Sequence, residues 1–533
     1  MKKLIENGYA PLAIGIAVAI GIFLGNYLSF ETESRTSLFG SNFKNQKVQR
    51  LLNYIDEEYV DEVDTDSILD VAINNILENL DPHSIYIPAS MHQQVKENMA
   101  GSFVGIGVQF RMYNDTLFVI NVLKGGPSFK AGLHNGDRIL MASSDTIYGK
   151  NIVSDSIIGK LKGKDGTDVE LKIYRPTSKK TFIKTITRGK VPIKSVDVAY
   201  MVNDSLGYIK INRFAGTTFD EFDKSLSNLL SLGMKSLVLD LRDNPGGFMH
   251  IAKQIADEFL HDNQLIVYTK NRKGEEDREL STGDGKFQEG NLYVLINENS
   301  ASASEVVSGA LQDNDRGTIV GRRSFGKGLV QQELDLGDGS AVRLTTARYY
   351  TPTGRSIQKS YSKGNKSYYS DYTRRLHNGE LISKDSIEVN DTLKFVTPKG
   401  KIVYGGGGII PDVFVSVDTT NYAGWVYQAI KYSNLSEFFL NYVDTHRLEL
   451  EKIDYASFRK NFDSDRVIYE DYIEFLKKRG VNPTTDINAE KILRLRIKAY
   501  TASLVWSDEK MYPIWDEIDP MIIKVKNLEG ELK

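Results

Sequence analysis

An apolar run that stops at a glycine-rich turn constrains the fold of this chain more than any other feature. Residues 237–247 read Leu-Val-Leu-Asp-Leu-Arg-Asp-Asn-Pro-Gly-Gly. Such a run is typical of a buried parallel strand that turns sharply at its carboxyl end, although an ordinary strand-to-helix turn fits it equally well. Open α/β folds place their ligands at that end of the sheet. The segment therefore predicts an α/β core with a functional turn at its last residues.

A serine lies at the start of a predicted helix. Residues 299–305 read Asn-Ser-Ala-Ser-Ala-Ser-Glu, and apolar residues follow at helical spacing from position 306 to position 311. Ser302 would lie beside backbone N–H groups that have no intrahelical partner and that can stabilise an oxyanion. Ser302-x-x-Glu305 is also a capping box, which requires no chemistry.

A lysine between two glycines follows later in the chain, at Lys327. A desolvated lysine loses its proton readily and can act as a general base, and serine with lysine is a known variant of the serine-histidine-aspartate triad. Residues 321–327 also nearly match a phosphate-binding loop. However, Gly328 stands where that loop has Ser or Thr, and residues 329–336 favour a strand over the required helix. We therefore do not expect a nucleotide site.

Together, the three segments resemble the C-terminal processing (tail-specific) serine peptidases. Two flanking segments also match, as does a short run after residue 404: residues 80–88, Leu-Asp-Pro-His-Ser-Ile-Tyr-Ile-Pro; residues 347–358, Ala-Arg-Tyr-Tyr-Thr-Pro-Thr-Gly-Arg-Ser-Ile-Gln; and residues 408–412, Gly-Ile-Ile-Pro-Asp. The resemblance implies an α/β peptidase core. One departure is Ser324, where the family usually has threonine, and this change keeps the hydroxyl group.

The resemblance also implies a role for each matching site residue. Ser302 corresponds to the nucleophile, Lys327 to its general base and Gln331 to the glutamine that orients the lysine amine. The oxyanion hole would be formed by the N–H of Ala303 and that of either Gly246 or Gly247, of which we prefer Gly247.

A histidine base is the competing interpretation, because His83 and His250 fall inside or next to matched segments. A lone histidine near a turn is more often structural, and neither position belongs to a serine-histidine-acid pattern. We retain the lysine.

Residues 99–188 resemble a PDZ domain, chiefly through Pro-x-x-x-Ala-Gly-Leu-x-x-Gly-Asp-x-Ile from Pro127 onward. PDZ domains add a ligand strand to an exposed sheet edge and hold its terminal carboxylate on backbone amides. The resemblance assigns that carboxylate-binding loop to Gly105, Ile106 and Gly107. The alternative is that Gly-Ile-Gly is only a strand bulge.

The N-terminal residues suggest the compartment. Residues 9–28 are apolar apart from glycines and Asn26, which is about long enough to span a bilayer. Lys2 and Lys3 precede this run, so the remaining chain should lie outside the cytoplasm. A cleaved signal peptide is the alternative, but residues 29–33 lack a small-x-small cleavage site. With the family resemblance, we expect a single-pass anchor in a bacterial inner membrane and a catalytic portion in the periplasm.

Composition adds mainly exclusions. The 533 residues predict several domains, the absence of cysteine excludes disulfides, and a net charge of −3 gives no reason to expect nucleic acid. No cluster has metal-ligand spacing, and the expected mechanism uses no metal or cofactor. The predicted order is a cytoplasmic N-terminus (1–8), an anchor (9–28), a helical segment (29–98), a PDZ domain (99–188), a peptidase core (189–420) with an insertion (359–404), and a helical C-terminal domain (421–533).

These predictions combine into a serine endopeptidase that recognises unfolded or loosely folded exported proteins by their free C-termini. The alternative is a membrane-anchored PDZ scaffold with an inactive core, against which the presence of Ser302, Lys327 and Gln331 argues. The insertion is expected to be a surface excursion, lid or docking element with short strands around residues 386–395. Homo-oligomers, an adaptor protein and the physiological substrate stay open.

Overall fold

The computed structural model describes residues 43–113, 115–149, 154–417, 435–462, 466–484 and 487–531, together with Gly15, Val18 and Trp425. The chain divides into two units, Met1–Ile73 and Asn74–Lys533. The anchor expected at residues 9–28 lies, apart from Gly15 and Val18, outside the described residues. None of the helices in the ranges given above is both long enough and apolar enough to cross a membrane.

Helices dominate the described residues ahead of the PDZ segment, as the sequence predicts. They are α3 (Phe43–Glu58), α4 (Thr65–Glu78) and α5 (Ala89–Ala100). A short strand, β1 (Ile85–Ile87), precedes α5. Gly101 ends α5 with a φ of 73°, a left-handed conformation that glycine adopts without steric cost.

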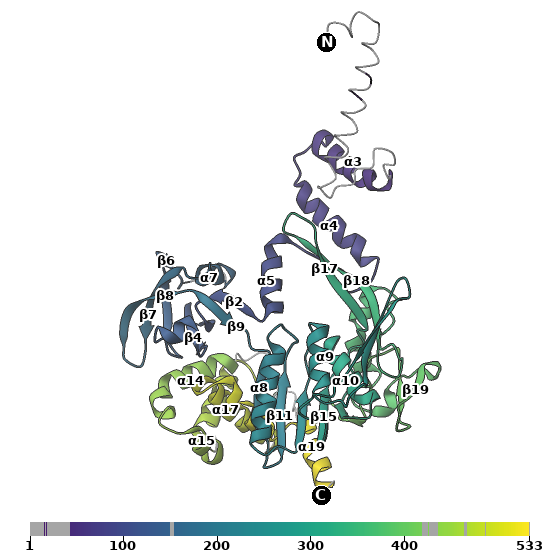
Figure 1. Ribbon diagram of the computed structural model, residues 1–533. Helices are drawn as coiled ribbons and strands as arrows, with labels where there is room; N and C mark the ends of the chain where they lie inside the picture. The colour runs from purple at the N-terminus through teal and green to yellow at the C-terminus, as the bar shows by residue number, and fades with distance from the viewer. Residues whose placement is uncertain are drawn as a thin grey trace, which may run out of the picture. The chain divides into compact units, whose positions relative to one another are not determined.

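The predicted peptidase core contains a six-stranded sheet (Figure 1). Its strand order is β10-β11-β12-β15-β16-β21. Its strands are β10 (Val196–Met201), β11 (Leu206–Ile211), β12 (Ser236–Asp240), β15 (Asn291–Ile296), β16 (Thr318–Gly321) and β21 (Val413–Phe414). β10 is antiparallel to β11, and every other neighbouring pair is parallel. The strand predicted from residue 237 is confirmed as β12, whose five residues are all buried.

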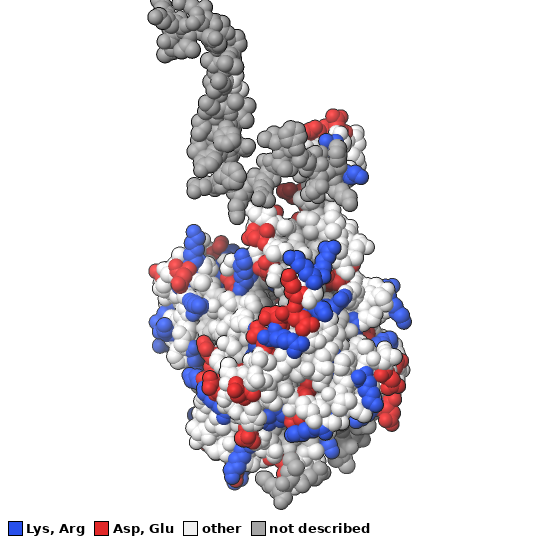
Figure 2. Space-filling view, turned by 45° about the vertical axis from the view of Figure 1, so that its right-hand side comes forward, with Lys and Arg blue, Asp and Glu red and all other residues white. Residues whose placement is uncertain are grey.

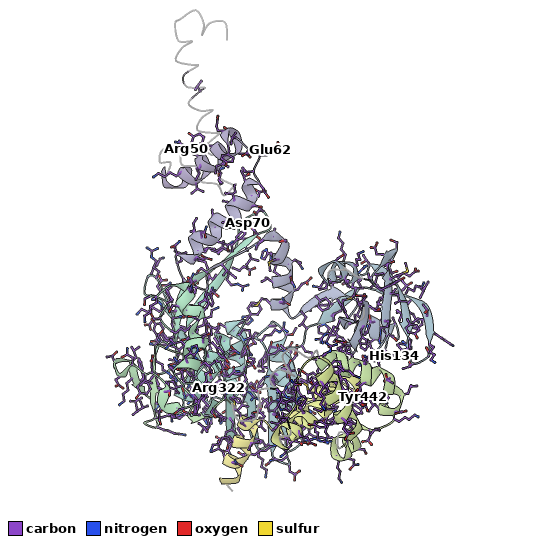
Figure 3. The ribbon with its side chains drawn as sticks, turned by 180° about the vertical axis from the view of Figure 1, so that it is seen from behind. Arg50, Glu62, Asp70, His134, Arg322 and Tyr442 are labelled. Atoms are coloured by element: carbon purple, nitrogen blue, oxygen red, sulfur yellow. The ribbon has the colours of Figure 1, made fainter. Side chains whose placement is uncertain are left out.

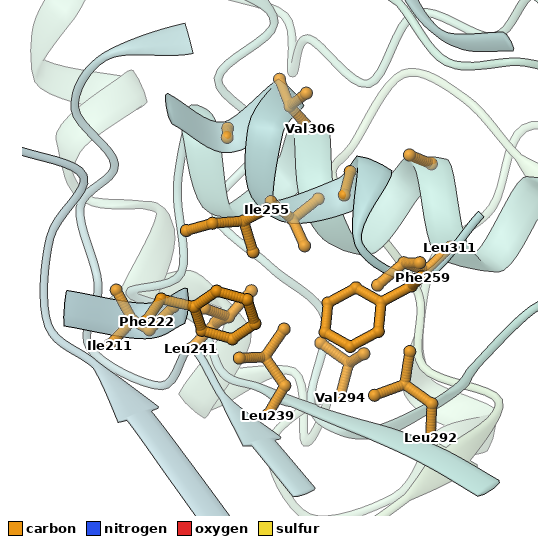
Figure 4. Packing of buried hydrophobic residues seen from close by; sticks show 14 of the residues in the cluster. Ile211, Phe222, Leu239, Leu241, Ile255, Phe259, Leu292, Val294, Val306 and Leu311 are labelled. Atoms are coloured by element: carbon orange, nitrogen blue, oxygen red, sulfur yellow. The ribbon is translucent and has the colours of Figure 1, made fainter. Parts of the chain in front are cut away.

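Helices cover both faces of this sheet. On one face lie α8 (Thr218–Ser231), α9 (Met249–Asp257) and α10 (Ala303–Asp313), which bury a cluster that includes Leu239, Phe222 and Ile255 (Figure 4). Val238 points the other way and packs with α19 (Pro520–Glu531). This alternation is the expected consequence of the two-residue period of a strand. The last described helix of the chain is therefore part of the core.

A second, antiparallel sheet adjoins the core. Its order is β1-β18-β13-β14, with β17 paired to β18, and its further members are β13 (Leu265–Asn271), β14 (Glu276–Leu280), β17 (Leu329–Asp335) and β18 (Ala341–Tyr350). β17 confirms the strand predicted after Lys327.

The insertion contains α11 (Asn365–Tyr369), α12 (Asp371–His377) and a hairpin of β19 (Lys394–Val396) with β20 (Ile402–Tyr404). The expectation of strands around residues 386–395 is right only from Lys394 onward. The preceding residues form 3₁₀ turns at Lys384–Ser386 and Asp391–Leu393. The side chains of Ser383 and Asn390 accept hydrogen bonds from the first turns, which favours turns over a strand there.

The PDZ segment forms a sheet of order β3-β4-β5-β7-β8, with β6 paired to β5. Its elements are β2 (Ser102–Gly105), β3 (Val108–Tyr113), β4 (Thr116–Val122), α6 (Pro127–Lys130), β5 (Arg138–Ala142), β6 (Asp145–Thr146), α7 (Ser154–Leu161), β7 (Asp168–Arg175), β8 (Lys180–Thr187) and β9 (Gly189–Pro192). β2 pairs with β9 outside this sheet. Among the described strands, β3 pairs only with β4, so it lies at an edge of the five-strand order given above.

The C-terminal helices pack beside the PDZ segment. They are α14 (Leu435–Leu450), α15 (Tyr455–Asn461), α16 (Arg466–Lys478), α17 (Ile487–Val505) and α18 (Tyr512–Trp515). Phe118 of β4 is buried in their apolar cluster, and Arg138 pairs with Asp444 at 2.8 Å. Figure 3 labels His134 and Tyr442 on the two sides of this contact.

Candidate active site

Three turns lie close together because they follow the carboxyl ends of three adjacent parallel strands. β12 leads into the glycine turn, β15 into the residues before α10, and β16 into a loop, residues 322–328, that we call the lysine loop. Between them lies a cavity of about 590 Å³. Its lining includes every residue predicted for the peptidase site: Gly246, Gly247, Ser302, Ala303, Lys327 and Gln331.

Ser302 immediately precedes α10 in a strained backbone conformation, with φ 55° and ψ −113°. Strain of this kind in a non-glycine residue is concentrated at functional sites. The Ser302 N–H donates to Oε2 of Glu305 at 2.9 Å, which is the glutamate half of the capping box. The pattern read from the sequence as a cap is thus present at the same residue that lines the cavity.

The glycine turn brings backbone close to Ser302. A Cβ on Gly247 would lie 2.1 Å from the Phe214 carbonyl oxygen, so only glycine fits there. The Gly246 N–H donates to Oδ1 of Asn244 at 2.9 Å. Among the hydrogen bonds of the described residues, none engages the N–H of Gly247 or of Ala303. Both groups are therefore available to a bound substrate.

Asn244 joins this turn to the turn that carries Ser302, a role that the sequence did not reveal. Its buried side chain donates to the Ile211 carbonyl at 2.9 Å. Its backbone carbonyl accepts from the Ala301 N–H at 3.0 Å and from the Ser304 hydroxyl at 2.9 Å. These bonds fix the two turns relative to each other.

An ion pair anchors the start of the glycine turn. Arg242 donates to both oxygens of the buried Asp240 at 2.6–3.0 Å, and its other nitrogen donates to Asp519 at 2.6 Å. Burial favours the neutral acid, but Arg242 and Lys210 hold the pKa of Asp240 well below its usual range. Asp519 directly precedes α19, so the end of the described chain supports the site.

Lys327 has the environment of a general base. Its Nζ donates to Oε1 of Gln331 at 2.8 Å. Burial, assisted by the charge of Arg343, lowers the pKa of Lys327 to about 8, against the opposing charges of Glu305 and Asp81. At neutral pH about one tenth of the molecules would carry the neutral amine, because the pKa lies about one unit above the pH.

Neither candidate histidine lines the cavity. His83 lies next to it, where its Nε2 is 2.7 Å from the Tyr368 hydroxyl. Burial and the charge of Lys327 lower the pKa of His83 to about 4, so the ring is neutral at pH 7. His250 is exposed and packs against Phe248. The geometry favours the lysine over either ring.

Glu305 makes more hydrogen bonds than its predicted role as a helix cap requires. Its fully buried carboxylate also accepts from the Gly326 N–H at 2.7 Å, from the Lys327 N–H at 2.9 Å and from the Ser324 hydroxyl. Glu305 therefore joins Ser302 to the loop that carries Lys327. The hydroxyl kept at Ser324 serves this contact.

The predicted carboxylate loop of the PDZ segment includes one glycine with a left-handed backbone, Gly107. Gly107 has a φ of 76°, and a Cβ there would lie 3.3 Å from Cδ of Pro127. The Ile106 carbonyl accepts from the Ser128 N–H at 2.8 Å, which holds the loop against α6. The loop leads directly into the edge strand β3.

Three parts of the chain match known family models. Residues 205–364 match the family described as Peptidase family S41, residues 104–185 match the PDZ domain family, and residues 425–507 match a family of unknown function. The structure of a photosystem II D1 C-terminal processing protease aligns with 70% of this chain and 88% of its own, at 28% identity and a TM-score of 0.35.

Two bacterial relatives carry the family names. The chain is 35% identical over 345 residues to the carboxy-terminal-processing protease of Bartonella bacilliformis, covering 63% of this chain and 78% of that protein. It is 34% identical over 316 residues to the carboxy-terminal processing protease CtpB of Bacillus subtilis, covering 59% of this chain and 65% of that protein. The chain thus spans slightly less than two thirds of the Bacillus relative. By these similarities, the chain belongs to the carboxy-terminal processing proteases of peptidase family S41, which are serine peptidases.

Proposed function

We propose that this protein is a serine endopeptidase in which Ser302 is the nucleophile and Lys327 the general base. One observation carries the proposal: a serine, a buried lysine with a depressed pKa and two unengaged backbone N–H groups line the same cavity. Gln331 orients the amine, and the N–H groups of Gly247 and Ala303 form the oxyanion hole. Gly246 is less suited, because its N–H already donates to Asn244.

The chemistry needs only these groups. Neutral Lys327 accepts the Ser302 hydroxyl proton as the oxygen attacks a peptide carbonyl, and the oxyanion is stabilised by the two N–H groups. The lysine then gives its proton to the departing amine, which leaves an acyl-enzyme. A water molecule, deprotonated by the again neutral lysine, attacks the ester. The ester C–O bond then breaks, the lysine returns its proton to the Ser302 oxygen, and the acid product departs.

Substrate capture belongs to the PDZ segment in this proposal. A C-terminal peptide would add as a strand to the edge of β3, with its carboxylate on the backbone of Gly105, Ile106 and Gly107. The substrates would be unfolded or loosely folded exported proteins. The apolar run at residues 9–28 and the preceding lysines support an inner-membrane anchor and a periplasmic site. The alternative, a scaffold with an inactive core, lacks support because the catalytic groups share one cavity.

The first prediction concerns the dyad. Ser302→Ala and Lys327→Ala should each lower kcat/KM on an unfolded protein by more than about 10³-fold, and the double variant should be no worse than either one, because the two residues act as a unit. His250→Ala is the control and should retain most activity. Near-normal rates for Lys327→Ala would exclude lysine as the base. Proteolysis of the unfolded protein, followed with the purified full chain, supplies the measurement.

The second prediction concerns pH. Because the base must be neutral, kcat/KM should rise with pH through about 8 and level off above it. Arg343→Gln removes a like charge and should move the rising limb to higher pH. Arg348→Gln, an exposed arginine on the same strand, is the matched control. A limb that stays in place in Arg343→Gln would mean that another group titrates.

The third prediction concerns capture. Amidating a peptide's C-terminus should weaken its binding to the inactive Ser302→Ala protein by about 10- to 150-fold, the loss of a charge-assisted contact of ~1.5–3 kcal/mol. Gly107→Leu should weaken binding of the acid peptide similarly. Gly166→Leu is the control for backbone strain, because Gly166 has a comparable positive φ but open space around it. Equal affinities for acid and amide would show that the domain does not recognise a free C-terminus.

A further inference from the structure

The insertion at residues 359–404 contains charged side chains that are buried. On the face shown in Figure 2, basic and acidic side chains are interspersed at the surface. In the insertion, by contrast, Arg375 is only 1% exposed and Glu380 only 2% exposed. Removing charges from water is costly unless they are paired and hydrogen-bonded. The partners of these two residues therefore indicate what the insertion does.

Arg375 of α12 covers the carbonyl side of the lysine loop. One guanidinium nitrogen donates to the carbonyls of Arg323 at 3.0 Å and Ser324 at 2.9 Å, and the other donates to that of Phe325 at 3.4 Å. Glu305, from the core, accepts from the N–H groups of the two residues that follow Phe325. The loop is thus held by a cation on its carbonyls and an anion on its N–H groups.

Further ion pairs hold Arg375 in place. Its Nε lies 2.9 Å from Asp371, one turn earlier in α12, and 3.7 Å from Glu380. The Glu380 carboxylate in turn accepts two hydrogen bonds from the Arg323 guanidinium, at 2.7 and 2.6 Å. Arg323 belongs to the lysine loop. The cluster therefore holds the loop through the Arg323 side chain as well as through backbone carbonyls.

A second route connects the insertion to the lysine amine. Gln358 accepts from the Gly328 N–H at 2.8 Å, and its amide donates to the Tyr368 hydroxyl at 3.3 Å. Because Gln358 donates to that hydroxyl, the hydroxyl hydrogen is free to be donated to Nε2 of the neutral His83, at 2.7 Å.

The route then continues through the backbone of His83. Its carbonyl accepts from the amide of Gln331, and Gln331 in turn accepts from Lys327. The neighbouring Tyr369 hydroxyl donates to the Pro82 carbonyl. The insertion therefore contacts both segments that determine where the amine lies.

We infer that the insertion is a positioning element for the catalytic lysine, in which Arg375 fixes the lysine loop and Tyr368 fixes the His83–Gln331 pair. The inference rests on the proposed function. Neither residue touches the reacting atoms, so each acts through Lys327. Loosening either contact should let water reach the amine. The amine would then be protonated in a larger share of molecules at neutral pH, and kcat should fall while KM changes little.

The test compares variants of the full chain at Arg375, at Tyr368 and at one exposed lysine of the insertion. Arg375→Met should lower kcat at pH 7 by about 10-fold or more and move the rising limb of kcat/KM to higher pH, since rehydration returns a lysine toward its ordinary pKa. Arg375→Lys should recover part of both effects, and Tyr368→Phe should produce a smaller change of the same kind. Lys366→Met is the control, because Lys366 is an exposed cation of the same insertion on α11, and it should behave as wild type.

The pH profile separates positioning from general destabilisation. A loss of folded protein lowers the amplitude of the profile without moving its limb. If Arg375→Met fails to fold, Tyr368→Phe decides, because it removes one hydroxyl and keeps the ring. Wild-type kcat, or a fall in kcat with an unmoved limb, in the folded variants would overturn the inference. A wild-type protein no more active than Ser302→Ala would instead contradict the proposed function.

Discussion

The carboxylate of Glu305 accepts hydrogen bonds from the backbone of both Ser302 and Lys327, and the geometry of the site depends on this junction. A fully buried carboxylate is costly unless its oxygens are satisfied, and here four donors satisfy them. The arrangement requires the helix start after β15 and the loop after β16 to meet. Neighbouring parallel strands bring them together without long connections.

Around this junction, distant parts of the chain add further constraints. Asn244 fixes the glycine turn against the turn that carries Ser302, and Arg242 ties the start of the glycine turn to Asp519. On the side of the insertion, Arg375 donates to backbone carbonyls of the lysine loop. Tyr349 places its hydroxyl 3.1 Å from the Ser302 carbonyl and 2.7 Å from that of Lys327. A depressed lysine pKa follows from this enclosure, because burial is its largest cause.

Local patterns account for what could be predicted. The apolar run at β12, the helix after Ser302 and the strand after Lys327 each follow from the periodicity or turn chemistry of a few consecutive residues. The family resemblance supplied roles for residues that the structure then brings into one cavity. Those roles stay predictions until the variants are measured.

The remaining contacts join residues far apart in sequence, and no local pattern marks them. Arg375 lies in a segment rich in Lys, Ser and Tyr, which indicates a solvated surface, yet its side chain is buried. The sequence indicates only the capping role of Glu305. Its other donors come from the lysine loop, which lies further along the chain, so no local pattern marks them. The strands expected before Lys394 are replaced by 3₁₀ turns, because side-chain caps compete with strand pairing.

The most direct test of the central claim is the modification rate of Ser302 by a small phosphonylating reagent, measured against pH, with the modified residue identified by mass spectrometry. Such a reagent needs no substrate recognition, so it reports only on activation of the nucleophile. The account predicts one adduct, on Ser302, with a rate that rises through about pH 8 and is lost in Lys327→Ala. An adduct on Ser300 or Ser304, or an unchanged rate in Lys327→Ala, would contradict it.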